Sequence, residues 1–83
     1  MPKINYLRSA PPDPYGKLKV LFAGKRDVLG LTNSKVGSRV GQTHPTVKSR
    51  ITNPERMTLE EMRRYAKALE ISREEICAAL PQW

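Results

Sequence analysis

The sequence THPTVKSRITN in the middle of the chain carries the side chains whose types and spacing best suit a chemical task. If it forms a helix, Val47 and Ile51 lie one turn apart and mark the buried side. The opposite side then presents Ser49, with Lys48 and Thr52 beside it. Hydroxyl groups and a lysine at this spacing exchange hydrogen bonds and attract anions, which is the chemistry that contacts base edges and phosphates. The segment therefore predicts a binding surface, with an ordinary solvated helix face as the alternative.

Residues that build catalytic or metal sites are scarce. His44 is the single histidine and Cys77 the single cysteine, so neither an intrachain disulfide nor a cysteine-based zinc site can form. Cys77 follows the apolar Ile76 and is expected to be a packed thiol. The sequence shows no serine, histidine and acid constellation and no nucleotide-binding loop, and its paired glutamates fall in first helical turns, where they stabilise the helix dipole. We expect no enzyme activity, no cofactor and no metal.

Apolar residues recur at helical spacing and predict one small all-α domain of five helices. Asp13 and Pro14 suit the N-cap and first position of the first helix, although DPYG equally suits a free turn. Leu18 and Phe22 lie on the apolar stripe of this helix. Two glycines predict that its last part, residues 24–30, frays or forms a loop.

The last two helices have complete start signals. The sequence MTLEEM predicts a hydrophobic staple and a capping box for a helix from about Thr58 to Leu69, and ISREEI predicts the same for a helix from about Ser72 to Leu80. Pro81 ends the second of these helices. The first is expected to bury its apolar residues, which are Leu59, Met62, Ala66 and Leu69.

The sequence LTNSKVGSRVGQTHPTVKSRI predicts two short helices joined by a tight turn. Val36 and Val40 face inward from the first helix, and Gly37 between them has no side chain to hold the second helix away. Gly41 stands where the chain must reverse, because glycine adopts the left-handed conformation without steric cost. Thr43 is expected to cap the second helix.

The net charge of +7 is unevenly distributed. Residues 1–54 hold ten Lys or Arg and two acids, whereas residues 55–83 hold five Lys or Arg and six acids. The basic part contains the two short helices, which implies a polyanionic partner, nucleic acid first and an anionic membrane surface second. A solubilising surface charge is the plain alternative. Because no apolar segment approaches the roughly 20 residues that span a bilayer, and the N-terminus lacks a signal region, a soluble cytoplasmic protein is expected.

Residues 1–13 contain three prolines and no helical period, so we expect an extended arm ahead of a domain at 14–83. Lys3 and Arg8 would let this arm touch a phosphate backbone or a minor groove. A floppy terminus and a short docked strand are the alternatives. Trp83 at the other end either folds back or anchors a partner subunit, with a disordered terminal residue as the alternative.

The stretch from Lys17 to Leu80, about three quarters of the chain, resembles the lambda repressor-like family of helix-turn-helix domains, of the Cro and Xre type. The family typically shows a glutamine opening its second helix, then a hydrophobic residue and an alanine, a turn glycine, and a β-branched residue. These positions hold Asn33, Val36, Gly37, Gly41 and Val47, so the first and third depart from the usual residues. The later NPERMTLEEMRRYAKALEIS is similar to the family's segment from its third helix to its fifth.

The resemblance implies a compact five-helix domain with its third helix, about 43–53, in the DNA major groove, and commonly a homodimer on a pseudo-palindromic operator. We therefore expect a sequence-specific regulator of transcription that binds double-stranded DNA, a repressor of phage or prophage type without a membrane partner or a small-molecule substrate. An antitoxin-like or inhibitory protein-binding module on the same fold is the alternative. RNA binding is less favoured because the aromatic residues form no stacking platform.

The expected DNA contacts fall into two groups. Base or groove contacts are expected from Thr43, His44, Pro45, Thr46, Lys48, Ser49, Thr52 and Asn53. Phosphate contacts are expected from Asn33, Lys35, Arg39, Arg50 and Arg56.

Overall fold

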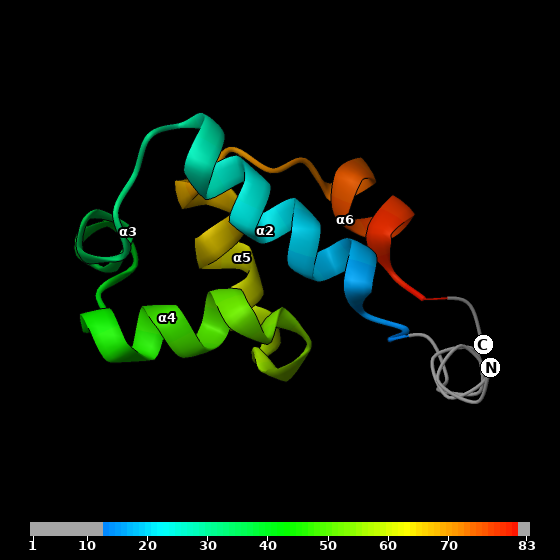
Figure 1. Ribbon diagram of the computed structural model, residues 1–83, viewed down its shortest axis with the longest axis horizontal. Coiled ribbons are helices and arrows are strands. Elements are labelled where there is room, and N and C mark those ends of the chain that lie inside the picture. Colours follow the sequence, from blue (N-terminus) through cyan, green and yellow to red (C-terminus); the bar gives the residue numbers. More distant parts are fainter. Residues whose placement is uncertain (1–12, 82–83) are drawn as a thin grey trace, which may run out of the picture.

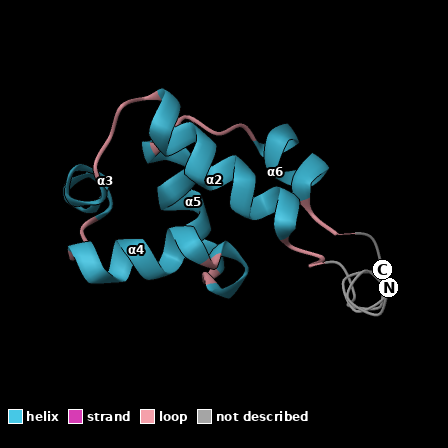
Figure 2. Cartoon of the chain, viewed as in Figure 1, coloured by secondary structure: helices cyan, strands magenta, loops and turns pink. Residues whose placement is uncertain are grey.

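The computed structural model describes residues 13–81, which form helices joined by short connections (Figures 1 and 2). The described part contains no strand, which confirms the all-α class. The expected arm before Asp13 and the terminal Trp83 lie outside the described residues. In chain order the elements are α2 (Gly16–Val28), α3 (Asn33–Val40), α4 (His44–Thr52), the 3₁₀ helix η1 (Pro54–Arg56), α5 (Leu59–Ala68) and α6 (Arg73–Ala79).

The helices enclose one hydrophobic core. In Figure 1, α2 crosses the middle of the molecule, α3 and α4 lie toward one end, α6 lies toward the other, and α5 is behind α2. The side chains predicted to face inward from the two short helices are all buried, which confirms their assignment to the core. The buried apolar residues are Leu18, Phe22, Val36, Val40, Val47, Ile51, Tyr65, Leu69, Ile71 and Ala79.

Helix α2 differs from its prediction at both ends. Residues 14 and 15 form a turn in which the Asp13 carboxylate accepts the Tyr15 N–H at 2.9 Å, so Tyr15, not Asp13, holds the N-cap position. The free-turn alternative was thus the right one. The expectation that residues 24–30 fray or form a loop is wrong for residues 24–28, which are helical, whereas residues 29–30 form a turn. Beyond Gly24, Lys25 pairs with Glu75 at 2.9 Å, which holds this part of α2 against α6.

Three helices begin at a side-chain cap, and the starts predicted at Thr58 and Ser72 are confirmed. The Thr32 hydroxyl accepts the Lys35 N–H at 3.1 Å and caps α3. Thr58 and Ser72 each form a capping box, in which the hydroxyl accepts an N–H three residues on and a glutamate accepts the N–H of the cap residue. These local signals are reliable because all of their atoms lie within four consecutive residues.

The inward side of α5 matches its prediction except at Leu59, since Leu69 is buried and Met62 and Ala66 are half-buried against the core. Leu59, expected in the core, is 90% exposed, whereas Tyr65 and Leu69 are fully buried. Counted along a regular helix, Leu59 lies about 100° from the mean direction of Tyr65 and Leu69, so it faces sideways. Cys77 is also exposed, so the prediction of a packed thiol is wrong. It lies about 200° from the buried Ala79, on the outer side of α6.

Candidate nucleic-acid interface

A three-residue turn joins α3 to α4 and depends on two glycines. Gly41 has φ +76°, in the left-handed region, as predicted. The Gly37 carbonyl accepts the N–H groups of Gly41 and Gln42 at 2.8 and 3.0 Å, which tightens the end of α3. A Cβ atom on Gly37 would overlap the Gln42 carbonyl oxygen and touch Val47 at 3.4 Å. The prediction that Gly37 admits the next helix is therefore confirmed, with the turn backbone itself as the close neighbour.

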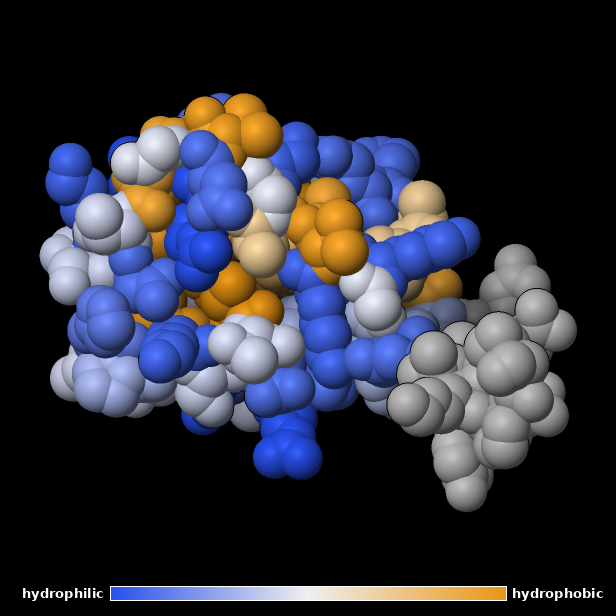
Figure 3. Space-filling view, viewed as in Figure 1, coloured by the Kyte–Doolittle hydropathy of each residue, from blue (hydrophilic) through white to orange (hydrophobic). Residues whose placement is uncertain are grey.

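The tight turn sets α4 at a steep angle to α3. In Figure 1, α3 is seen end-on while α4 lies across the view, along the edge of the molecule away from α2. Val47 and Ile51 of α4 are buried, whereas Lys48, Ser49 and Thr52 are exposed. The space-filling view shows this edge of the molecule mainly in hydrophilic and neutral colours (Figure 3). The outward face of α4 thus has the polar character predicted for it.

The first turn of α4 also presents polar groups. Thr43 has the backbone conformation of an N-cap residue, but the predicted side-chain cap is wrong, since its hydroxyl makes no hydrogen bond to the helix N–H groups. The hydroxyl lies 3.1 Å from that of Thr46. His44 and Pro45 are exposed, and Thr46 and Asn53 are half-buried. The two threonine hydroxyls therefore lie at the positive end of the α4 dipole.

Positive charge around α3 and α4 is largely uncompensated. Residues 28–54 contain four Lys or Arg and no acid. Acids elsewhere pair with local bases: Asp13 with Lys19 at 2.6 Å, and Glu60 with two arginines of α5. Within residues 13–81, Lys35 and Lys48 form no salt bridge, and neither does the neighbouring Arg56. An anion approaching α4 would thus meet exposed cations.

Three of the residues predicted to contact phosphate make contacts within the protein. The Asn33 amide oxygen accepts a hydrogen bond from Arg26 at 3.0 Å. Arg39 donates to the Ala68 carbonyl at the end of α5, at 3.1 Å. Arg50 donates through Nε to Glu61 of α5 at 2.8 Å. Of the predicted phosphate contacts, Lys35 and Arg56 are the ones whose charged groups have no hydrogen bond within the described part of the chain.

A polar cluster behind α4 was not predicted. It consists of Gln42 from the turn, Arg50 from α4, and Glu61 and Tyr65 from α5, and hydrogen bonds of 2.5 to 2.8 Å join its members. The sequence predicts a phosphate contact for Arg50 and only a capping box for Glu61, and it predicts no role for Gln42. The hydrogen bonds of the cluster join residues that are 11 to 23 positions apart, so spacing gave no signal of the cluster. The sole sequence hint was that each is a polar residue beside core positions.

The cluster shifts the pKa of two of its members. The Thr58 N–H, and then the Arg50 and Gln42 side chains, donate hydrogen bonds to Glu61 and lower the pKa of its carboxyl group to about 2. Burial, together with the negative charge of Glu61, raises the pKa of the Tyr65 phenol to about 12. At neutral pH the carboxylate is therefore ionised and the phenol keeps its proton.

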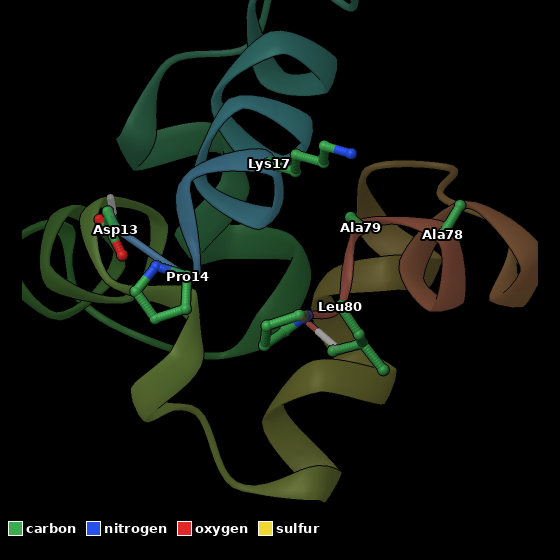
Figure 4. A pocket seen from close by; sticks show the side chains of 7 residues that line it. Asp13, Pro14, Lys17, Ala78, Ala79 and Leu80 are labelled. Carbon is green, nitrogen blue, oxygen red and sulfur yellow. The ribbon is translucent and has the colours of Figure 1, made fainter. Parts of the chain in front are cut away.

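Two surface hollows elsewhere offer little chemistry. The first lies between the start of α2 and the end of α6, with Asp13, Pro14 and Lys17 on one side and the residues around Leu80 on the other (Figure 4). Its single carboxylate already binds Lys19. The second is apolar and lies between α5 and α6, beside the exposed Leu59. Residues 13–81 contain no group of three or more His, Cys, Asp or Glu placed to bind a metal.

No helix within residues 13–81 has the length and apolar character needed to cross a membrane. Comparisons with protein-family models, with curated proteins and with solved structures find no significant match to the chain. Function is therefore inferred from the geometry and charge of α3, the turn and α4.

Proposed function

We propose that this protein is a sequence-specific DNA-binding regulator of transcription, with a lambda repressor-like helix-turn-helix formed by α3, the turn and α4. The observation that carries this proposal is the outward face of α4. It is polar and basic, it lies at the edge of the molecule, and residues 28–54 around it contain no acid. A helix with these properties fits the DNA major groove in shape and in charge.

The side chains on and around the outward face of α4 have separate proposed roles. Lys48, Ser49 and Thr52 contact base edges or the phosphates beside them, because they are exposed on the side opposite the buried Val47 and Ile51. Lys35, on α3 before the turn, and Arg56, on η1 after α4, bind phosphates. The remaining proposed contacts come from the first turn and the end of α4, through Thr43, His44, Pro45, Thr46 and Asn53.

The resemblance to phage-type repressors extends the proposal to the mode of regulation. A homodimer would place two copies of α4 in successive major grooves, about 34 Å apart, and would repress by occupying its operator. Salt should weaken this binding strongly, because each neutralised phosphate releases a counterion.

Selection of duplexes from a random DNA pool tests the proposed function. We expect enrichment of one family of sequences with two related half-sites, their centres about 10 base pairs apart. The mass of the protein–DNA complex would show whether one or two copies of the protein bind each duplex. Recovery of an unenriched pool, at low salt and with folded protein, would contradict the proposal and favour the protein-binding alternative.

A further inference from the structure

The Glu61 carboxylate joins three parts of the domain. Its Oε2 accepts hydrogen bonds from Gln42 Nε2 and from Arg50 Nε, both at 2.8 Å. Its Oε1 accepts the Thr58 N–H at 2.9 Å, within the capping box of α5. One side chain, held in place by its own helix start, therefore binds both the turn before α4 and α4 itself.

Tyr65 binds the oxygen of the Gln42 side-chain amide, the nitrogen of which binds Glu61. Its phenol donates to Gln42 Oε1 at 2.5 Å, while its ring is fully buried in the core. Both ends of the Gln42 amide are thus bound by α5. The Gln42 N–H donates to the Gly37 carbonyl at 3.0 Å, so the backbone of this residue is bound to α3. Gln42 connects α3 and α5 at the point where α4 begins.

The hydrogen bonds to the Glu61 carboxylate are stronger than those of a fully exposed carboxylate. The Glu61 side chain is 14% exposed and that of Arg50 is 32% exposed, so water competes weakly for the carboxylate. Hydrogen bonds between ionised partners are roughly twice as strong as those between neutral groups. Arg50 belongs to α4, between Ser49 and Ile51. The hydrogen bond from its guanidinium to α5 therefore also restricts the rotation of α4 about its axis.

We propose that Glu61 is a positioning residue for DNA recognition, and that Arg50 serves this purpose rather than binding phosphate. This inference rests on the proposed function. Glu61 does not contact DNA itself. It holds Gln42 and Arg50 so that Ser49 and Thr52 keep one orientation toward the groove, since discrimination between bases requires side chains held on a rigid, preorganised support.

The first test measures amide hydrogen exchange in the free protein, at pH 7, for Glu61→Gln, Tyr65→Phe and Glu60→Gln. The Glu60→Gln change is the matched control, because Glu60 is the preceding residue, carries the same charge and pairs with Arg63 and Arg64 instead. In Glu61→Gln and in Tyr65→Phe, we expect the exchange rate of the amides of Gln42 and α4 to rise. This increase should be at least tenfold greater than the increase for amides in the middle of α2. Glu60→Gln should leave these amides unchanged.

The second test measures affinity for selected and for random duplexes. Both glutamine variants lose one negative charge, so electrostatics alone would strengthen the binding of either variant to all DNA alike. Positioning instead predicts that Glu61→Gln, and also the uncharged change Tyr65→Phe, reduce the ratio of selected to random affinity about tenfold, whereas Glu60→Gln keeps that ratio.

The outcomes separate the inference from the function on which it rests. Unchanged exchange at Gln42, or an unchanged affinity ratio in Glu61→Gln with selected duplexes, overturns the positioning role. If the unaltered protein enriches no duplex, the proposed function fails. The exchange data then decide by themselves whether Glu61 holds α4.

Discussion

Gln42 and Glu61 are nineteen residues apart in the chain, yet their side chains meet at 2.8 Å, where the turn before α4 touches the first turn of α5. This contact makes the orientation of α4 depend on α5 as well as on α3. Buried Val47 and Ile51 already pack α4 into the core, and the Gln42–Glu61 contact adds a polar support at the start of this helix. A surface helix that presents side chains for recognition benefits from such support.

Acid should remove the contribution of Glu61 to stability. Its pKa is lowered from 4.5 to about 2, mainly by the Thr58 N–H and then by Arg50 and Gln42. A carboxyl group whose pKa is lower in the folded state stabilises fully above its unfolded pKa, and this contribution is lost as the pH falls from about 4.5 toward 2. We expect Glu61→Gln to cost about 1–3 kcal/mol at pH 7.

Urea unfolding of both proteins from pH 7 to pH 2 measures this difference. The difference in unfolding free energy should shrink below pH 4.5, while other carboxyl groups titrate in both proteins and cancel. A difference that stays constant down to pH 2 would show that the carboxylate does not stabilise the fold through its charge.

Two glycine-to-alanine changes should have opposite effects. Gly37→Ala places a Cβ against the backbone carbonyl of Gln42, which can move only if the turn moves. We expect a loss of about 1–3 kcal/mol, as for other overpacked sites. Gly24→Ala is the control, since its Cβ would meet nothing within 4 Å, and it should stabilise α2 by about 0.5–1 kcal/mol. Thermal melts followed by circular dichroism compare the two, and a stabilising Gly37→Ala would refute the close contact.

A strained residue lies two positions beyond the end of α5. Glu70 has φ +57°, in the left-handed region, and is the one residue other than glycine among 13–81 with this conformation. It is exposed, so Glu70→Gly should stabilise the protein by about 1 kcal/mol through relief of that strain. Glu74→Gly, in the first turn of α6, should instead destabilise by a similar amount. Chemical denaturation measures both, and equal losses would argue against the strain.

DNA binding should become less dependent on salt concentration, by a predictable amount, when one basic side chain that contacts phosphate is replaced. Lys35 and Arg56 have no salt-bridge partner within residues 13–81, so each is free to neutralise a phosphate. Replacing either with alanine should reduce the slope of log affinity against log salt by about 0.9. Arg73→Ala, on α6 at the other end of the molecule, is the control and should leave the slope unchanged. Identical slopes in all variants would place the phosphate contacts elsewhere.

The parts of the fold that depend on neighbouring residues could be predicted from the sequence. Capping boxes, the left-handed Gly41 and the inward valines follow from local stereochemistry and helical period. Leu59 could not be placed, because the buried side of α5 is set by how Tyr65 packs against the other helices. In an amphipathic helix, a rotation of about 100° exchanges a core position for a surface one.

The candidate site could be predicted in part for the same reason. The exposure of Lys48, Ser49 and Thr52 follows from the burial of Val47 and Ile51 on the same helix. The partner of Arg50 does not follow, because Glu61 belongs to another helix and reaches Arg50 only after the chain has turned at Pro54–Arg56. A basic residue next to a predicted DNA-binding face can equally bind its own protein.

The most direct test of the central claim is the affinity of a Lys48→Ala, Ser49→Ala, Thr52→Ala variant for the selected duplex, measured beside the unaltered protein and Lys67→Ala. All three replaced side chains are exposed, so the circular dichroism spectrum and the melting curve should change little. We expect the variant to bind the selected duplex no better than a random one, whereas Lys67→Ala keeps its preference. A folded triple variant with undiminished preference for the selected duplex would contradict the assignment of α4 as the helix that recognises DNA.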